Sequence, residues 1–247
     1  MPGEKSDKEP ITATDEKQTS LGIFRFSYLA DDRYLNSPAR EEIDKLSLPE
    51  LFVSEAEKAA QDLEIKQSLE IVIEIPSADE ANFVIPTLGI GARTLSDKKV
   101  LFQLDLANPH ILESLVKWQS RQIAHEFNHL ARWEMQGKTL LDALIFEGLA
   151  VNYEENWGGE IQETPWGHAL EPQQLKIEWQ KAQKELNSPN YDYEGWFFGT
   201  NKTHPNWTGY ASGTAIVKKY LDFHPDEPMK ELVKKPSQEI LEQSNFV

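Results

Sequence analysis

The sequence predicts an α+β fold, with strands and a hairpin first and a mainly helical half after them. Two patterns indicate this order. In the first part, short runs such as residues 69–75 alternate apolar and polar side chains, as a half-buried strand does. After Pro109, apolar residues recur at helical spacing, and Gly137 interrupts them. We therefore expect an α/β part over 21–107 and a helical part over 108–247.

The elements of the first part follow from the same reasoning. Charged and apolar residues at helical spacing predict a helix, β-rich runs predict strands, and a turn-like Ser-Asp-Lys-Lys segment predicts a hairpin. The elements expected are a helix within 40–66, strands at 69–75 and 82–85, and a hairpin joining 89–91 to 100–106.

The helical half divides at glycine and proline residues. The helices expected there span 111–135, 139–153, 170–187 and 208–222. Between the last two, residues 187–207 are rich in Asn, Gly, Pro and aromatic residues, which predicts an ordered loop.

Residues 1–20 carry many charges and few apolar side chains. Such a segment cannot bury enough apolar surface to fold, so we expect a disordered N-terminal tail or tether. The remaining residues, 21–247, are expected to form a single domain with enough apolar material for a core.

Charge and composition exclude several classes of function. The formal net charge of −16 disfavours binding to nucleic acids or anionic membranes, since both require a basic surface. With no cysteine, the chain has no disulfide, no cysteine nucleophile and no thiolate metal site. A metal ion would have to be held by His, Asp and Glu.

No apolar run approaches the ~18 residues that cross a bilayer, and the N-terminus lacks the pattern of a secretory signal. We therefore expect a soluble, cytoplasmic protein without membrane insertion. A signal or lipoprotein tether removed upstream of residue 1 remains an alternative.

The pattern that indicates chemistry is His125-Glu126-Phe127-Asn128-His129, an H-E-x-x-H motif within the helix expected over 111–135. Residues four apart on a helix differ by about 40° around its axis, so both imidazoles project from one face. This spacing suits two ligands of one zinc ion. Glu126 lies about 100° from His125, where it can accept a proton from a water molecule on the metal.

A catalytic zinc ion commonly has three protein ligands, and Glu147 is the best candidate for the third. It lies on an otherwise apolar helical face, where an unpaired carboxylate is costly. An ion pair with a neighbour such as Arg132 is the alternative. Asp142 could instead be the outer partner of a ligand histidine, whereas Glu154 is a weaker candidate ligand near a polar helix end.

HEFNH, followed after 17 residues by EGLA, resembles the gluzincin class of zinc metallopeptidases, and more closely the family of predicted Zn-dependent proteases, DUF2268. Two flanking features match the family: a glycine-containing hairpin before the H-E-x-x-H helix, and the late segment 209–213, GYASG. The resemblance covers roughly residues 70–240. One departure is Phe127-Asn128, where Tyr-His is expected.

The resemblance implies a zincin-like fold with His125, His129 and Glu147 as ligands of one zinc ion per chain and Glu126 as catalytic base. It also implies that the edge of the hairpin, at 89–93 or 100–106, pairs with an extended peptide substrate.

Peptide hydrolysis also requires a donor to the oxyanion that forms on the carbonyl oxygen. Tyr210, at the start of the helix expected over 208–222, is the preferred candidate, and a packing role is its alternative. His204 and His168 lie in expected loops and are surface histidines on the simpler interpretation.

The sequence thus predicts a zinc-dependent peptidase acting on a peptide or protein, with an undetermined oligomeric state. The alternative is a non-catalytic regulatory or binding protein that keeps the fold and the zinc ion. The presence of Glu126 favours the enzyme, because a pure metal-binding module has no need of that base.

Overall fold

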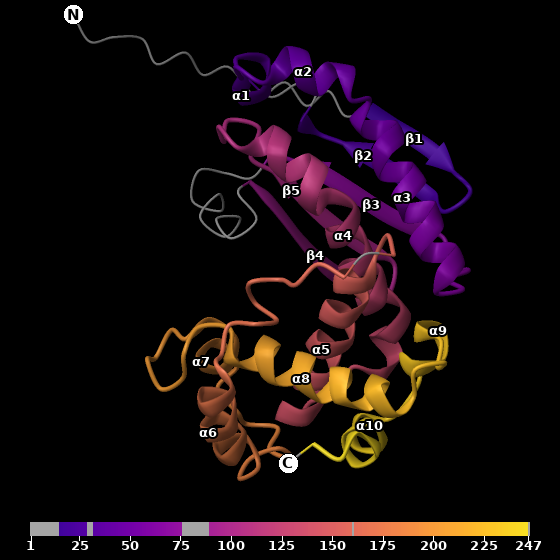
Figure 1. The fold of residues 1–247 in the computed structure, drawn as a ribbon. Helices are drawn as coiled ribbons and strands as arrows, with labels where there is room; N and C mark the ends of the chain where they lie inside the picture. Colours follow the sequence, from indigo (N-terminus) through magenta and orange to yellow (C-terminus); the bar gives the residue numbers. More distant parts are fainter. Residues whose placement is uncertain (1–14, 29–31, 76–88, 160, 247) are drawn as a thin grey trace, which may run out of the picture. The chain divides into compact units, whose positions relative to one another are not determined.

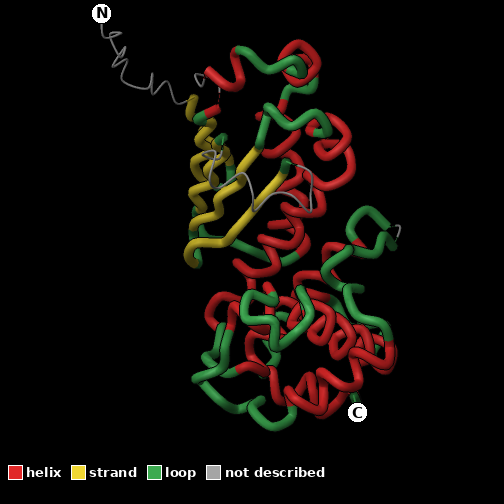
Figure 2. Tube along the Cα trace, turned by 90° about the vertical axis from the view of Figure 1, so that its left-hand side faces the viewer, coloured by secondary structure: helices red, strands yellow, loops and turns green. Residues whose placement is uncertain are grey.

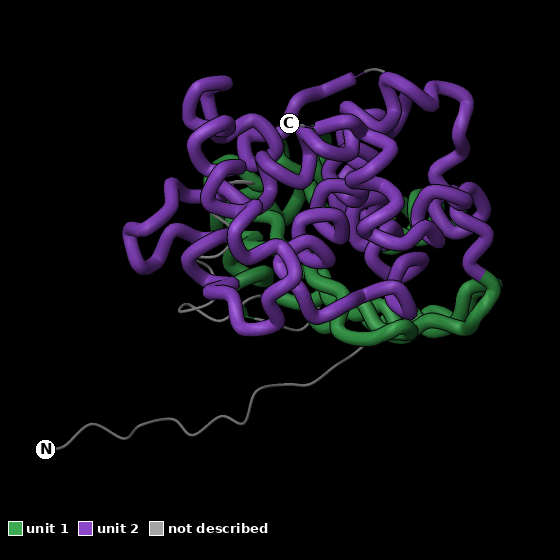
Figure 3. The backbone as a smooth tube through the Cα atoms, turned by 90° about the horizontal axis from the view of Figure 1, so that it is seen from below, with its two compact units in different colours: residues 1–57, 66–119 green, residues 58–65, 120–247 purple. Residues whose placement is uncertain are grey.

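The computed structural model describes residues 15–28, 32–75, 89–159 and 161–246. The chain divides into two compact units (Figure 3). Unit 1 comprises residues 1–57 and 66–119, and unit 2 comprises residues 58–65 and 120–247.

Unit 1 is built on a five-stranded mixed sheet with the strand order β1-β2-β3-β5-β4 (Figures 1 and 2). The three inner strands are parallel, and each outer strand runs antiparallel to its neighbour. The strands are β1 (Asp15–Thr19), β2 (Gly22–Phe26), β3 (Leu69–Glu74), β4 (Ile90–Ser96) and β5 (Lys99–Leu104).

The inner strands carry the core of unit 1. Ile71 and Ile73 of β3 and Val100 of β5 are fully buried, as expected where a parallel sheet is covered. Helix α3 (Leu48–Asp62) packs on the sheet through Phe52, whose ring meets that of Phe102 edge-on at 5.3 Å.

The structure confirms the strand at 69–75 and the hairpin, now β4 and β5. It also corrects two expectations. Residues 15–19, assigned to the disordered tail, form β1, which pairs with β2 because the Thr19–Gly22 turn folds it back. The single helix within 40–66 is divided into α2 (Arg40–Lys45) and α3, because Ser47 adopts a left-handed backbone with φ 46°. The predicted strand at 82–85 lies outside the described residues.

Unit 2 is helical and is organised around α5 (Leu140–Asn156). A capping box between Thr139 and Asp142 begins this helix. All but two of the residues from Leu140 to Glu155 are buried, on every side of the helix. Helix α5 is therefore a central helix rather than a surface one. Its neighbours in the chain are α4 (Ile111–Arg132), a short 3-10 turn (Trp133–Met135), α6 (Pro172–Ala182), α7 (Tyr193–Phe198), α8 (Thr208–Phe223), α9 (Met229–Leu232) and α10 (Ser237–Ser244).

The four helices predicted in this half are confirmed, with one further correction. Residues 187–207 are not only loop, because Tyr193–Phe198 form α7. The Asp192 carboxylate caps the first turn by accepting from the Gly195 N–H at 3.0 Å, and Gly199 ends the helix with φ 63°. Two aromatic side chains of α7, Trp196 and Phe197, pack into the core of unit 2.

Among the helices that the structure describes, none has the length and apolarity needed to cross a membrane.

Candidate metal centre

Helix α4 supplies two histidines on successive turns. His125 and His129 are buried, with 7% and 6% of their surface exposed. Their ring centroids lie 4.7 Å apart and their planes are nearly perpendicular. The i, i+4 spacing therefore produces the shared face that the sequence predicted.

Helix α5 supplies the carboxylate. Glu147 is 8% exposed and lies between apolar residues of the central helix. Gly148, the next residue, lies where α5 crosses α8, and a Cβ there would be 2.3 Å from the backbone of Gly213. The closest approach of α5 to α8 thus lies immediately beside Glu147.

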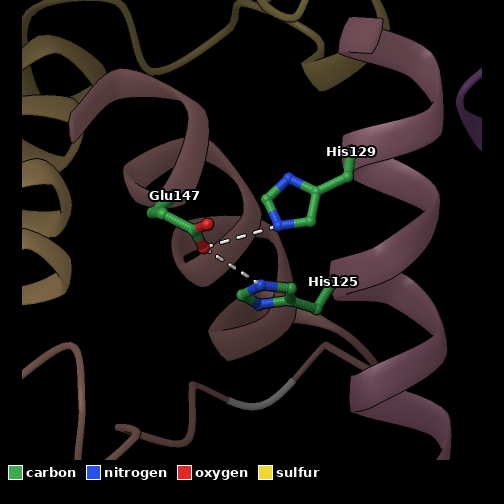
Figure 4. A group of neighbouring side chains, drawn as sticks. All are labelled: His125, His129 and Glu147. Atoms are coloured by element: carbon green, nitrogen blue, oxygen red, sulfur yellow. Dashed lines mark ion pairs between the residues drawn. The ribbon is translucent and has the colours of Figure 1, made fainter. Parts of the chain in front are cut away.

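The three side chains converge on one point (Figure 4). Oε2 of Glu147 lies 3.5 Å from Nε2 of His125 and 3.4 Å from Nε2 of His129. Tetrahedral zinc with bonds of ~2.0–2.1 Å would hold neighbouring ligand atoms about 3.3–3.4 Å apart. Within the described residues, the buried Oε2 of Glu147 has no partner nearer than these two imidazole nitrogens, and neither makes a well-formed hydrogen bond to it. The donor set and this unsatisfied oxygen fit a metal ion better than a hydrogen-bonded cluster.

Neighbouring charges shift the pKa values of His125 and Glu147. Burial lowers the pKa of His125, but its contacts with Glu147 and Glu154 outweigh burial and hold this pKa well above its usual value. Burial raises the pKa of Glu147, but the two histidines lower it by more, so that this pKa falls to about 2. Glu147 is therefore an anion at neutral pH, as a metal ligand must be.

Glu126 is buried beside this group, at 4% exposed, and does not belong to the three-residue cluster. Its charge acts on His125 and also on Tyr210.

Glu154 is the site residue whose role the sequence interpretation missed. It was assigned to a polar helix end, but it is fully buried, and its Oε2 lies 3.0 Å from Nδ1 of His125. The signal was available: Glu147 and Glu154 are seven residues apart, which places both on one face of α5.

Two alternatives for neighbouring residues are wrong. Asp142 does not partner a ligand histidine, since its carboxylate caps α5 by accepting from Thr139. Arg132 does not pair with Glu147, since its guanidinium donates to Val233, Lys235 and Ser237. Asp142 is held by a local contact three residues before it, and Arg132 by a segment more than 100 residues later.

Tyr210 lies in the first turn of α8, three residues before Gly213. A Cβ on Gly213 would be 2.0 Å from the Leu144 carbonyl oxygen, so this face of α8 is turned toward α5. Burial raises the pKa of Tyr210 well above its usual value, and the charge of Glu147 raises it further. The ring also packs edge-on against Phe197, with centroids 5.3 Å apart.

The two loop histidines have partners elsewhere in unit 2. His204 is buried, stacks on Trp196 at 3.9 Å between centroids, and lies 2.7 Å from Glu178. His168 lies 3.2 Å from the Glu155 carboxylate. Neither belongs to the metal-ligand cluster.

Comparison with known proteins places the chain in a family. The family described as Predicted Zn-dependent protease (DUF2268) matches residues 51–242, well over half of the chain. A curated relative, the "Uncharacterized protein YjaZ" of Bacillus subtilis (strain 168), is 33% identical over 110 residues. That stretch covers 41% of this chain and 42% of the relative, so less than half of either is aligned. No solved structure matches the chain.

Proposed function

Because the chain belongs to the family of predicted Zn-dependent proteases (DUF2268), we propose that it is a zincin-like peptidase of the gluzincin type. The observation that carries the proposal is the convergence of two imidazole nitrogens on a buried carboxylate oxygen, at 3.4 and 3.5 Å. His125, His129 and Glu147 would hold one zinc ion. Two histidines and a carboxylate without cysteine match the ligand sets of catalytic zinc sites.

When bound, zinc supplies a Lewis acid that polarises a carbonyl group and lets water lose a proton near neutral pH. Glu126 accepts that proton as the water oxygen attacks the carbonyl carbon of the scissile peptide bond. The same carboxyl group then delivers the proton to the amide nitrogen as the C–N bond breaks. Water is consumed, a new carboxyl group and a new amine are formed, and Glu126 returns to its ionised state.

Tyr210 is proposed to donate its O–H to the carbonyl oxygen as negative charge develops there. Burial raises the pKa of Tyr210, so its hydroxyl keeps at neutral pH the proton that it would donate. The close approach of Gly213, three residues later on α8, to the Leu144 carbonyl of α5 supports this proposal.

The substrate is proposed to be a peptide or protein. The family description names a protease, and the relative carries no stated activity, so the cleaved sequence is not specified. A non-catalytic zinc-binding protein would not need a buried carboxylate at position 126, and no observation favours that alternative.

Metal content measured by elemental analysis is the first test, with wild type beside Glu147→Ala. We expect about one zinc per chain in the wild type and a large loss in the variant. A wild type that takes up no zinc after reconstitution would overturn the proposal.

Turnover is the second test, measured by mass spectrometry on a mixed peptide library. Glu126→Gln should keep the zinc ion and lose activity by about 10²–10⁴-fold. Tyr210→Phe should keep the zinc ion and lower kcat more than it raises KM, because the missing donor acts on the transition state. Activity that survives unchanged in Glu126→Gln would exclude the role of this base.

A further inference from the structure

Glu154 is a buried carboxylate next to the candidate metal centre. Its side chain is fully buried at the end of α5, two turns beyond Glu147 on the same face of the helix. An ionised carboxylate in such a place is costly unless it accepts hydrogen bonds or is paired with a cation. Its carboxylate oxygens lie 3.0 Å from Nδ1 of His125 and 3.4 Å from the Gln122 amide nitrogen. The nearer partner of the carboxylate is therefore a residue of the candidate metal centre, while the Arg121 guanidinium donates to the Glu154 main-chain carbonyl at 3.3 Å.

His125 lies between the two glutamates of α5. Its Nε2 faces Oε2 of Glu147, and its Nδ1 faces Oε2 of Glu154. A neutral imidazole carries one N–H and one lone pair. When Nδ1 carries the proton and donates it to Glu154, the lone pair is left on Nε2, which points toward the cluster. The hydrogen bond thus selects the tautomer that can bind a metal ion.

His129 has a different environment. Within the described residues, its Nδ1 is buried without a hydrogen-bond partner. Its ring instead stacks on Phe146, with centroids 4.1 Å apart and planes only 8° from parallel. One histidine is thus oriented by a charged hydrogen bond and the other by an aromatic face.

We propose that Glu154 is a positioning residue, which holds His125 in its Nδ1-protonated form and directs Nε2 to the metal ion. This inference rests on the proposed zinc site. Hydrogen bonds from a carboxylate to the second nitrogen of a ligand histidine orient the ring and raise its basicity, and losing one typically costs 10- to 100-fold in metal affinity.

The chain offers a matched control in the next residue. Glu155 is also buried, at 5% exposed, and also stands at the end of α5. Its carboxylate accepts from the Thr164 N–H at 2.7 Å and from the Thr164 hydroxyl at 2.8 Å. It therefore anchors a following segment rather than a metal ligand, and Glu155→Gln tests the cost of neutralising a buried carboxylate here.

The experiment measures zinc affinity by competition with a chromophoric chelator, in the wild type, Glu154→Gln and Glu155→Gln. We expect Glu154→Gln to bind zinc about 10- to 100-fold more weakly, and Glu155→Gln to bind within about 3-fold of the wild type. Equal affinity in wild type and Glu154→Gln would overturn the inference while leaving the zinc site standing. If the wild type binds no zinc, the proposed function fails as well, so the two failures are distinguishable.

A second measurement does not depend on the variant folding. In zinc-loaded wild type labelled with ¹⁵N-histidine, we expect the Nδ1–H proton of His125 to resonate farther downfield and to exchange more slowly than that of His129. A carboxylate acceptor produces both effects, and stacking on Phe146 produces neither. Two indistinguishable ring protons would contradict the proposal.

Discussion

Gly148 of α5 and Gly213 of α8 meet backbone to backbone. A Cβ built on Gly148 would lie 2.3 Å from the carbonyl group of Gly213, and one built on Gly213 would lie 2.0 Å from the Leu144 carbonyl oxygen. Real Cβ atoms do not approach backbone atoms so closely, so the crossing of these helices depends on both glycines.

Gly213→Ala is therefore expected to destabilise the protein, although alanine is the better helix former. On propensity alone the change would stabilise an exposed helix by about 1 kcal/mol. Here the methyl group would force α5 and α8 apart, and we expect a loss of about 2–4 kcal/mol in the free energy of unfolding, measured by urea denaturation. The exposed Lys218→Ala on the same helix should be nearly neutral. A gain of stability in Gly213→Ala would show that the crossing is not tight.

Phe146→Leu should weaken zinc binding by loosening His129. The stacked pair contributes about 0.5–1.5 kcal/mol beyond simple burial, which corresponds to about 2- to 10-fold in affinity. Chelator competition measures this effect. Phe52→Leu, at a buried aromatic position of unit 1, is the control, because it should lower stability and leave zinc affinity unchanged. Equal zinc affinities in Phe146→Leu and the wild type would indicate that the ring does not orient His129.

Arg132→Met should loosen the C-terminal helices. The guanidinium is 1% exposed and donates to the Val233 and Lys235 carbonyls, each at 2.9 Å, and to the Ser237 hydroxyl at 3.1 Å. Burial lowers its pKa to about 10, so it remains charged at neutral pH. Removing it leaves buried acceptors unsatisfied, at a cost of about 2–4 kcal/mol.

Hydrogen exchange is the measurement for Arg132→Met. Amides of α10 should exchange faster, whereas those of the unit 1 sheet should be unaffected. Arg40→Met, which removes a half-exposed guanidinium 3.6 Å from Asp44, is the control and should change stability by under about 1 kcal/mol. Unaltered exchange in α10 would contradict the assigned role.

Tyr220 should make the protein sensitive to alkali. Burial and the hydrogen bond from its hydroxyl to Glu227 at 2.5 Å raise its pKa from 10.0 to about 12. Folding favours the neutral phenol, so its contribution to the free energy of unfolding is fully present below pH 10. This stabilisation is lost as the pH rises from 10 through 12, by about 3 kcal/mol in total. Tyr220→Phe should flatten this part of the stability profile relative to the wild type. Parallel profiles would exclude Tyr220 as the cause.

Much of the candidate site was predictable because its signals are local. The spacing of His125 and His129 fixes their shared helical face, since the period of an α-helix does not depend on what surrounds it. The apolar setting of Glu147 indicated a paired or metal-bound carboxylate for a similar reason. The boundary between the first two helices of the helical half followed from Gly137.

What escaped prediction depends on contacts between distant segments. A polar run at residues 15–19 was not identified as a strand, because its pairing partner determines its conformation. Helix α7 is short and is held by its cap and by aromatic packing, so its own residues carry little periodic signal.

By itself, the sequence determined the α+β order of the chain, the H-E-x-x-H helix and the candidate ligand on the next helix, because periodicity and burial cost are properties of single segments. Only the tertiary structure decided that Glu147 meets both imidazoles, that Glu154 rather than Asp142 faces His125, and that Arg132 serves the C-terminal helices. The contacts of Glu147 and Glu154 join α5 to α4, and those of Arg132 join α4 to residues more than 100 positions later, so which side chains meet depends on how these segments pack.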